Sequence, residues 1–193
     1  MADKDAFAER GRTLEEEYFH RKEKEVIEKM RRKAQADDQR RRLGEQIGFA
    51  DEEVLRILQD LGYTPDTIML LPLVPLIQTA WAEGGVTQKE RNLIVSEARE
   101  RAVTSGSPAD EQLNRWLNHK PSEDFFEQTL RAMRAILQTQ TPETRAARER
   151  DLLSRATAIA SASGGIIGFH AVCDEERQIL AHIQDELEKS AVI

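Results

Sequence analysis

Apolar residues follow a helical period along most of this chain. From about residue 51 onward they recur every three or four positions, the spacing that places them on one face of an α-helix. Proline and glycine stand between these segments rather than within them, and we find no convincing strand. The pattern therefore predicts an all-α fold. The helices are expected at about 3–42, 51–61 and 68–81, with later ones opening near residues 87, 107, 122, 141 and 173 or 174.

Local signals support several of these helix starts. Thr87-Gln-Lys-Glu90 has the form of a capping box, and Leu93, Ile94 and Ala98 are expected on the inner face of the helix that follows. Thr64–Pro65 has the form of a cap followed by a first-turn proline. Residues 68–81 are apolar nearly all round and predict a buried central helix. Its two prolines, Pro72 and Pro75, are expected to interrupt or start it.

The stretch from Phe7 to Met30 has a different pattern. It is rich in Glu, Arg and Lys and predicts a helix, but its apolar residues form two stripes about a quarter turn apart. The stripes are Phe7, Leu14 and Tyr18, then Phe19, Val26 and Met30. A helix that packs on the core of its own protein usually keeps one apolar face. The quarter-turn shift between the two stripes therefore favours a helix that enters the cleft of another protein. A solvated charged helix with scattered aromatic residues explains the pattern equally well.

The same stretch resembles, without a gap up to about residue 31, the inhibitory segment of the mitochondrial F1-ATPase inhibitor protein. The matched residues are Phe7, Arg10, Glu15, Glu16, Tyr18, Phe19, Lys24, Glu25, Ile27 and Met30. In that family the segment is a helix that inserts at a catalytic interface of the rotary ATPase and stops hydrolysis. The resemblance implies that these residues bind the α and β subunits of an F1-ATPase. The chain departs from the family in lacking a glycine-rich lead-in and a His-rich coiled coil, and in having Val26 at a usually polar position.

Two glycines mark the predicted domain boundary. Residues 31–42 are almost devoid of apolar side chains and are expected to form an exposed extension of the helix or a frayed linker. Gly44 and Gly48 follow directly. We therefore predict a long charged helix over 1–47 and an all-helical domain over 48–193.

The predicted domain contains a weak internal sequence repeat, which we call the internal echo. Ala-Trp-Ala-Glu-Gly-Gly-Val at 80–86 and Ala-Ser-Ala-Ser-Gly-Gly-Ile at 160–166 each end an apolar helix and precede a helix with an acidic start. Residues 70–94 resemble the signature hairpin of the TerB-like tellurite-resistance family. Those domains are all-helical bundles of two similar halves, often linked with stress responses and divalent metal. The acidic signature positions correspond here to Glu83 and Glu90, while Ser163 replaces an acidic residue in the second half.

Charge and cysteine content narrow the classes of function. Residues 1–47 hold 13 Lys/Arg and 12 Asp/Glu and the rest hold 15 and 23, so the net charges are +1 and −8. Such an acidic domain argues against nucleic-acid binding. A single cysteine, Cys173, excludes an internal disulfide and suits the cytoplasm. We expect no signal peptide and no membrane span, because no apolar run is long enough.

No constellation of residues in the sequence has the form of an active site, so we expect neither an enzyme nor a cofactor. Glu83 and Glu90 are candidate metal ligands, as are residues 174–176, although helix capping explains them more simply. His170 and Cys173 are three residues apart and lack the further ligands of a zinc site. His20, with glutamates at helical spacing, is a candidate pH-sensing residue.

Two functions remain from the sequence. One is a regulatory protein that inhibits ATP hydrolysis by an F1-type ATP synthase through its first helix. The other is a stress-associated interaction or divalent-metal-sensing module, in which the acidic bundle is the working part.

Overall fold

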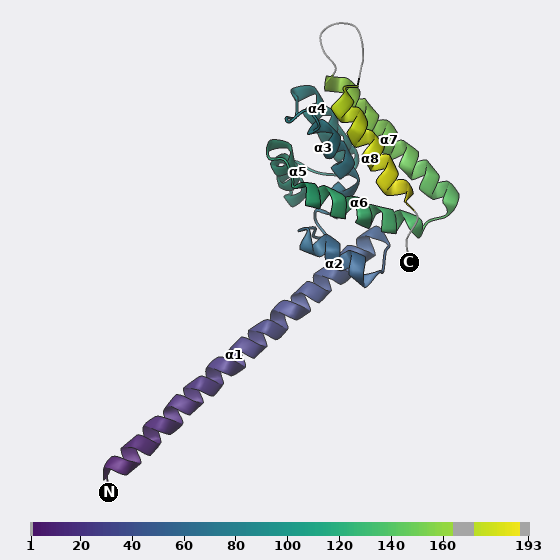
Figure 1. The fold of residues 1–193 in the computed structure, drawn as a ribbon. Helices are drawn as coiled ribbons and strands as arrows, with labels where there is room; N and C mark the ends of the chain where they lie inside the picture. Colours follow the sequence, from purple (N-terminus) through teal and green to yellow (C-terminus); the bar gives the residue numbers. More distant parts are fainter. Residues whose placement is uncertain (1, 164–171, 190–193) are drawn as a thin grey trace. The chain divides into compact units, whose positions relative to one another are not determined.

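The computed structural model describes residues 2–163 and 172–189, and describes side chains from Phe19 to Ala162 and from Val172 to Lys189. Every regular element in these ranges is a helix, which confirms the predicted all-α fold (Figure 1). The elements are α1 (Ala2–Ile47), α2 (Glu52–Asp60), the 3₁₀-helix η1 (Ile68–Leu73), α3 (Val74–Ala80), α4 (Gln88–Glu100), α5 (Pro108–Asn118), α6 (Glu123–Gln138), α7 (Pro142–Ser163) and α8 (Asp174–Glu188).

The chain divides into two compact units, Met1–Arg42 and Leu43–Ile193. The first unit is helical from Ala2 onward, and no side chain from 19 to 42 is buried. The second unit holds the last turn of α1 and all later helices. The division therefore lies earlier than the predicted boundary after residue 47. The physical reason is Leu43, which is only 1% exposed and belongs to the hydrophobic core of the second unit.

The glycines at this boundary have separate structural roles. A Cβ atom on Gly44 would lie 2.6 Å from the carbonyl oxygen of Phe49 and 2.9 Å from a methyl carbon of Leu55. Gly44 therefore permits a close approach of the returning chain, and its carbonyl accepts a hydrogen bond from the Phe49 N–H at 3.0 Å. Gly48 has a φ of +63°, the left-handed conformation that glycine adopts readily after a helix.

Two helical hairpins form the centre of the second unit. The first is α3 and α4, the second is α7 and α8, and α7 packs on both α3 and α4 (Figure 1). All seven residues of α3 are buried, as predicted for the central helix. The helix α3 also contacts α6, α8 and η1, so it lies inside the bundle. The helices α2 and α5 pack on α6 and η1 respectively.

The structure contradicts two local expectations. Thr64 and Pro65 do not open the central helix. Residues 64–67 form a turn, in which the Thr67 N–H donates to the Thr64 carbonyl at 3.0 Å, and η1 follows before α3 begins. Proline lacks an N–H and disrupts a helix interior, which explains why α3 starts with Pro75 in its first turn. Leu93 is 41% exposed rather than inward, because Ile94 lies about 100° around the helix and takes the buried position.

Candidate functional site

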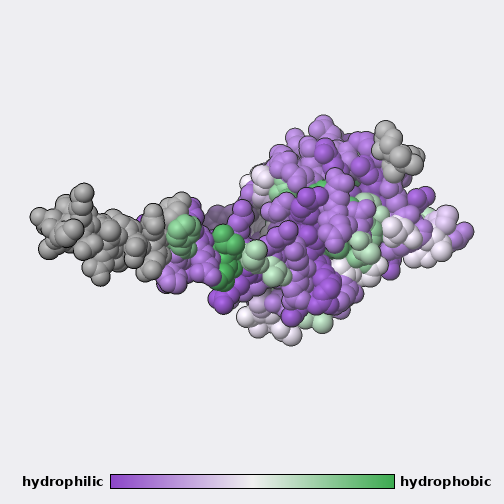
Figure 2. Space-filling view, turned by 90° about the horizontal axis from the view of Figure 1, so that it is seen from below, coloured by the Kyte–Doolittle hydropathy of each residue, from purple (hydrophilic) through white to green (hydrophobic). Residues whose placement is uncertain are grey.

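Exposed apolar side chains gather on α1. Within the part of the chain whose side chains are described, five large hydrophobic residues are exposed, and four of them belong to this helix. They are Phe19 at 66%, Val26 at 50%, Ile27 at 42% and Met30 at 67% exposed. Figure 2 shows hydrophobic side chains at the surface of α1 among hydrophilic ones. Exposed apolar groups that lie together mark a surface for another protein.

The spacing of these residues places most of them on one side of the helix. Phe19, Val26 and Met30 are separated by seven and four residues, which keeps them within about 40° of one another. Ile27 lies on the adjoining face. Charged side chains surround the stripe, and Lys22 pairs with Glu25 at 3.1 Å along the helix surface. Such an exposed pair is weak and can exchange for a partner's charges at little cost.

The structure describes only part of the predicted binding segment. Phe19, Lys24, Glu25, Ile27 and Met30 are all exposed on α1, as a binding surface requires. The helix also runs through the other matched positions, but their side chains lie outside the described residues. These are Phe7, Arg10, Glu15, Glu16 and Tyr18.

His20, the candidate pH-sensing residue, is exposed next to this stripe. Its Nδ1 atom lies 3.8 Å from the carboxylate of Glu23, one turn further along α1.

A second candidate region lies where α4 and α8 begin. Each helix opens with a capping box, as the internal echo suggests. The carboxylate of Glu90 accepts the Thr87 N–H at 2.7 Å, and that of Glu176 accepts the Cys173 N–H at 2.9 Å. Both glutamates are buried, at 2% and 1% exposure. The capping box predicted at Thr87 is thus present, and Cys173 takes the corresponding place in the second hairpin.

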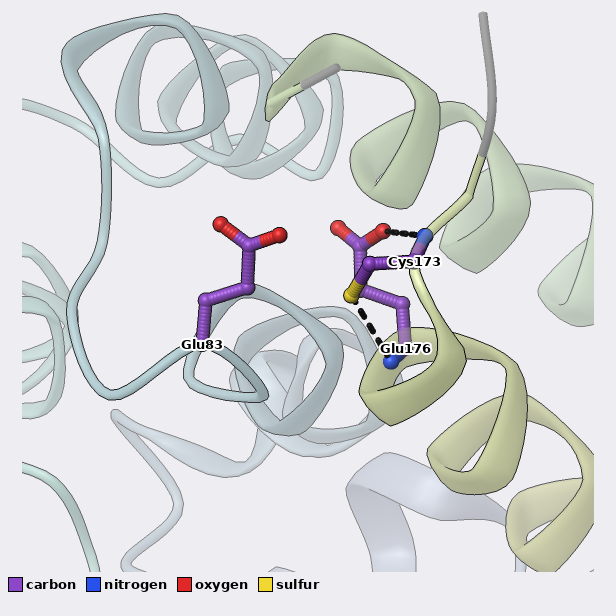
Figure 3. Close-up of side chains that lie close together, drawn as sticks. All are labelled: Glu83, Cys173 and Glu176. Carbon is purple, nitrogen blue, oxygen red and sulfur yellow. Dashed lines mark hydrogen bonds between the residues drawn. The ribbon is translucent and has the colours of Figure 1, made fainter. Parts of the chain in front are cut away.

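The second capping box adjoins Glu83, which follows α3 (Figure 3). One possible ligand atom from each of Glu83, Cys173 and Glu176 lies within 4.8 Å of the others. Sequence reasoning selected Glu83, Glu90 and residues 174–176, so it included two members of this cluster but missed the convergence of Cys173 with them. The available signal was the internal echo, which makes Cys173 the equivalent of Thr87. The proposed partner of Cys173, His170, lies outside the described residues.

At the two helix starts the pKa values of Cys173 and Glu90 are raised, whereas a hydrogen bond from its own backbone lowers the pKa of Glu175. Burial raises the pKa of the Cys173 thiol to about 12, and the nearby carboxylates of Glu83, Glu175 and Glu176 act in the same direction. Burial also raises the pKa of Glu90 above its ordinary value, against the hydrogen bonds from Thr87. A metal ion would bind the thiolate, so it would have to displace the thiol proton. The Sγ atom also accepts the Glu176 N–H at 3.3 Å, so the cluster fits a helix cap better than a metal site.

The raised pKa predicts an unreactive thiol. Iodoacetamide should alkylate Cys173 at pH 8 at least about tenfold more slowly in the folded chain than in the urea-unfolded chain, because only the thiolate reacts. The measurement is the rate of mass increase under each condition. Equal rates would contradict the assignment of Cys173 as a half-buried, protonated cap.

The two regions offer different chemistry. The apolar side chains of the stripe on α1 are exposed and are not part of the hydrophobic core. Near Cys173, by contrast, the polar atoms of Cys173 and Glu176 already form the capping box of α8. No described helix is long and apolar enough to cross a membrane. Comparisons with protein-family models, with curated proteins and with solved structures found no match to this chain.

Proposed function

We propose that this protein inhibits ATP hydrolysis by an F1-type rotary ATPase, and that α1 is the inhibitory element. The observation that carries the proposal is the exposure of Phe19, Ile27 and Met30 on a helix that buries nothing else in this region. These are apolar positions at which the chain resembles the mitochondrial inhibitor. The protein is then a regulator that works by binding, with no catalytic step of its own.

The physical basis is the docking of a helix into a groove. In this mode, apolar residues at helical spacing fill pockets of the partner and supply most of the affinity. Phe19, Ile27 and Met30 are the described residues suited to that role. Charged residues such as Lys24 and Glu25 would fix the register of the helix and contribute more to specificity than to affinity. Because this part of α1 is already helical, binding does not have to order it from a coil.

The second unit would carry the inhibitory helix. Its buried, capped helices make it a stable body without the aid of α1 before Leu43. The competing function, a stress-associated interaction or divalent-metal-sensing module, would place the activity in this second unit. We rank it second because two members of the Glu83–Cys173–Glu176 cluster, Cys173 and Glu176, already form the capping box of α8.

The deciding experiment titrates F1-ATPase from the same source with the full chain and with a chain that starts at Asp37. We expect the full chain to slow hydrolysis at micromolar concentration and the shortened chain to have no effect. An unchanged rate at tens of micromolar full chain, a level that weak helix-in-groove binding reaches, would overturn the proposal. Recovery of the ATPase α and β subunits with the full chain, and not with the shortened chain, would separate this function from the alternative.

A further inference from the structure

The second unit contains a cavity of about 740 Å³ that neither candidate region includes. It lies among η1, α3, α6 and α7, and its floor is made by buried apolar side chains. These are Leu71, Leu76, Met133, Leu137 and Leu152. The volume lies within the range of about 300–1,000 Å³ typical of ligand sites, and spaces between the helices of a bundle are common places for them.

A smaller cavity of about 340 Å³ adjoins the first. The two share Leu71, Pro72, Ile136 and Arg148, so these residues line both spaces. The smaller cavity is completed by apolar residues that include Ile47 and Ile68. Apolar residues thus line both cavities, and Arg148 borders each of them.

The charges at the edge of the larger cavity differ in how they are compensated. Arg101 donates to Glu97 at 2.7 Å, and Arg155 donates to Asp151 at 2.9 Å and also to Glu97. Their positive charges are therefore already paired.

Arg148, by contrast, is exposed and forms no hydrogen bond or ion pair with any described residue. The remaining acid at the edge, Glu143, lies in the first turn of α7, where the helix dipole offsets a negative charge. One cation of the cavity therefore lacks a counter-charge.

We propose that this cavity binds a long-chain monocarboxylate of the fatty-acid class, with its alkyl chain on the apolar floor and its carboxylate on Arg148. An alkyl chain suits a floor that is built from apolar side chains, because each methylene removed from water adds to affinity. A carboxylate suits the guanidinium, which binds it through two parallel N–H donors. A single negative charge suits a site with a single uncompensated cation.

The first test places a large side chain in the cavity by substituting an exposed residue at its edge. Ala147 and Ala146 are neighbouring exposed residues of α7, and only Ala147 lines the cavity. Isothermal titration of the full chain with dodecanoate should give saturable binding. Ala147→Trp should weaken that binding by roughly tenfold or more, since the new side chain occupies the ligand's space, whereas Ala146→Trp should bind as wild type does.

The second test addresses the carboxylate. Arg148→Gln should weaken dodecanoate binding by roughly tenfold, because it removes the charge-assisted pair, and should leave binding of the uncharged dodecyl maltoside unchanged. Arg150→Gln is the matched control, since Arg150 is an exposed residue of α7 outside the cavity. Glu143→Gln should tighten dodecanoate binding by removing the one repulsive charge at the edge.

Three results of the binding tests would overturn the proposal. They are the absence of binding by wild type at about 1 mM dodecanoate, equal losses in Ala147→Trp and Ala146→Trp, and equal losses in Arg148→Gln and Arg150→Gln. A sedimentation coefficient that rises with wild-type concentration, and does not rise for Ala147→Trp, would assign the cavity to a second copy of the chain and would also overturn it.

Discussion

Joint replacement of Phe19 and Met30 by alanine should raise the half-inhibitory concentration against F1-ATPase by on the order of a thousandfold. Each side chain, if it fills a pocket of the partner, contributes about 2 kcal/mol, and each 1.4 kcal/mol corresponds to a factor of ten. Both residues are about two-thirds exposed in the free protein, at 66% and 67%. Alanine also has a higher helix propensity than either, so the helix itself should persist. The loss of inhibition would then report binding rather than folding.

Val26 and Ile27 provide a matched control inside α1. They are adjacent apolar residues of similar exposure, 50% and 42%, but only Ile27 belongs to the set that resembles the inhibitor family. Ile27→Ala should raise the half-inhibitory concentration by roughly tenfold or more. Val26→Ala should have little effect, as should Leu93→Ala on α4. Equal losses for Val26→Ala and Ile27→Ala would show that any apolar residue suffices, and the specific resemblance would then carry no functional meaning.

Two truncations at the end of α1 should differ sharply in stability. A chain that starts at Asp37 loses none of the side chains that the structure describes as buried, so its free energy of unfolding should stay within about 0.5 kcal/mol of the full chain. A chain that starts at Gly48 also loses Leu43 and the carbonyl of Gly44 that accepts the Phe49 N–H. Removal of a buried leucine side chain costs about 2–5 kcal/mol.

Urea unfolding, followed by the helical circular dichroism signal, measures both truncations. Leu43→Ala in the full chain should reproduce most of the loss caused by the longer truncation, because the burial of this one side chain accounts for it. Indistinguishable midpoints for the two truncated chains would mean that Leu43 stabilises nothing, and the division between the two units would then fall after residue 47.

The sequence by itself was enough to predict the all-α class, the starts of most helices and the stripe on α1. Helix periodicity and capping depend on residues three or four positions apart, so they can be read from a local stretch. Thr87 and Glu90, for example, form a capping box through contacts within four residues. Phe19 and Met30 were identified in the same way, because a charged helix offers few other places where apolar side chains gather.

Other features required the tertiary structure. Leu43 is a single leucine after a charged run, so its sequence context does not indicate burial. Only the tertiary structure shows that it belongs to the core. Leu93 and Ile94 are chemically alike, and the packing of α4 against α7, η1 and α3 decides which one is buried. Cysteine is not a preferred N-cap residue, so the sequence left the start of the last helix open between residues 173 and 174, and the capping box of α8 decided for Cys173.

The cavity beside Arg148 also depended on the fold. Its lining comes from four helices spread between Leu71 and Arg155, and each segment is an ordinary amphipathic or apolar stretch by itself. An empty space between helices is set by how closely they pack and by the sizes of the facing side chains. Local periodicity predicts neither how closely the helices pack nor which side chains face one another. Both depend on pairs of residues that only the tertiary structure brings together.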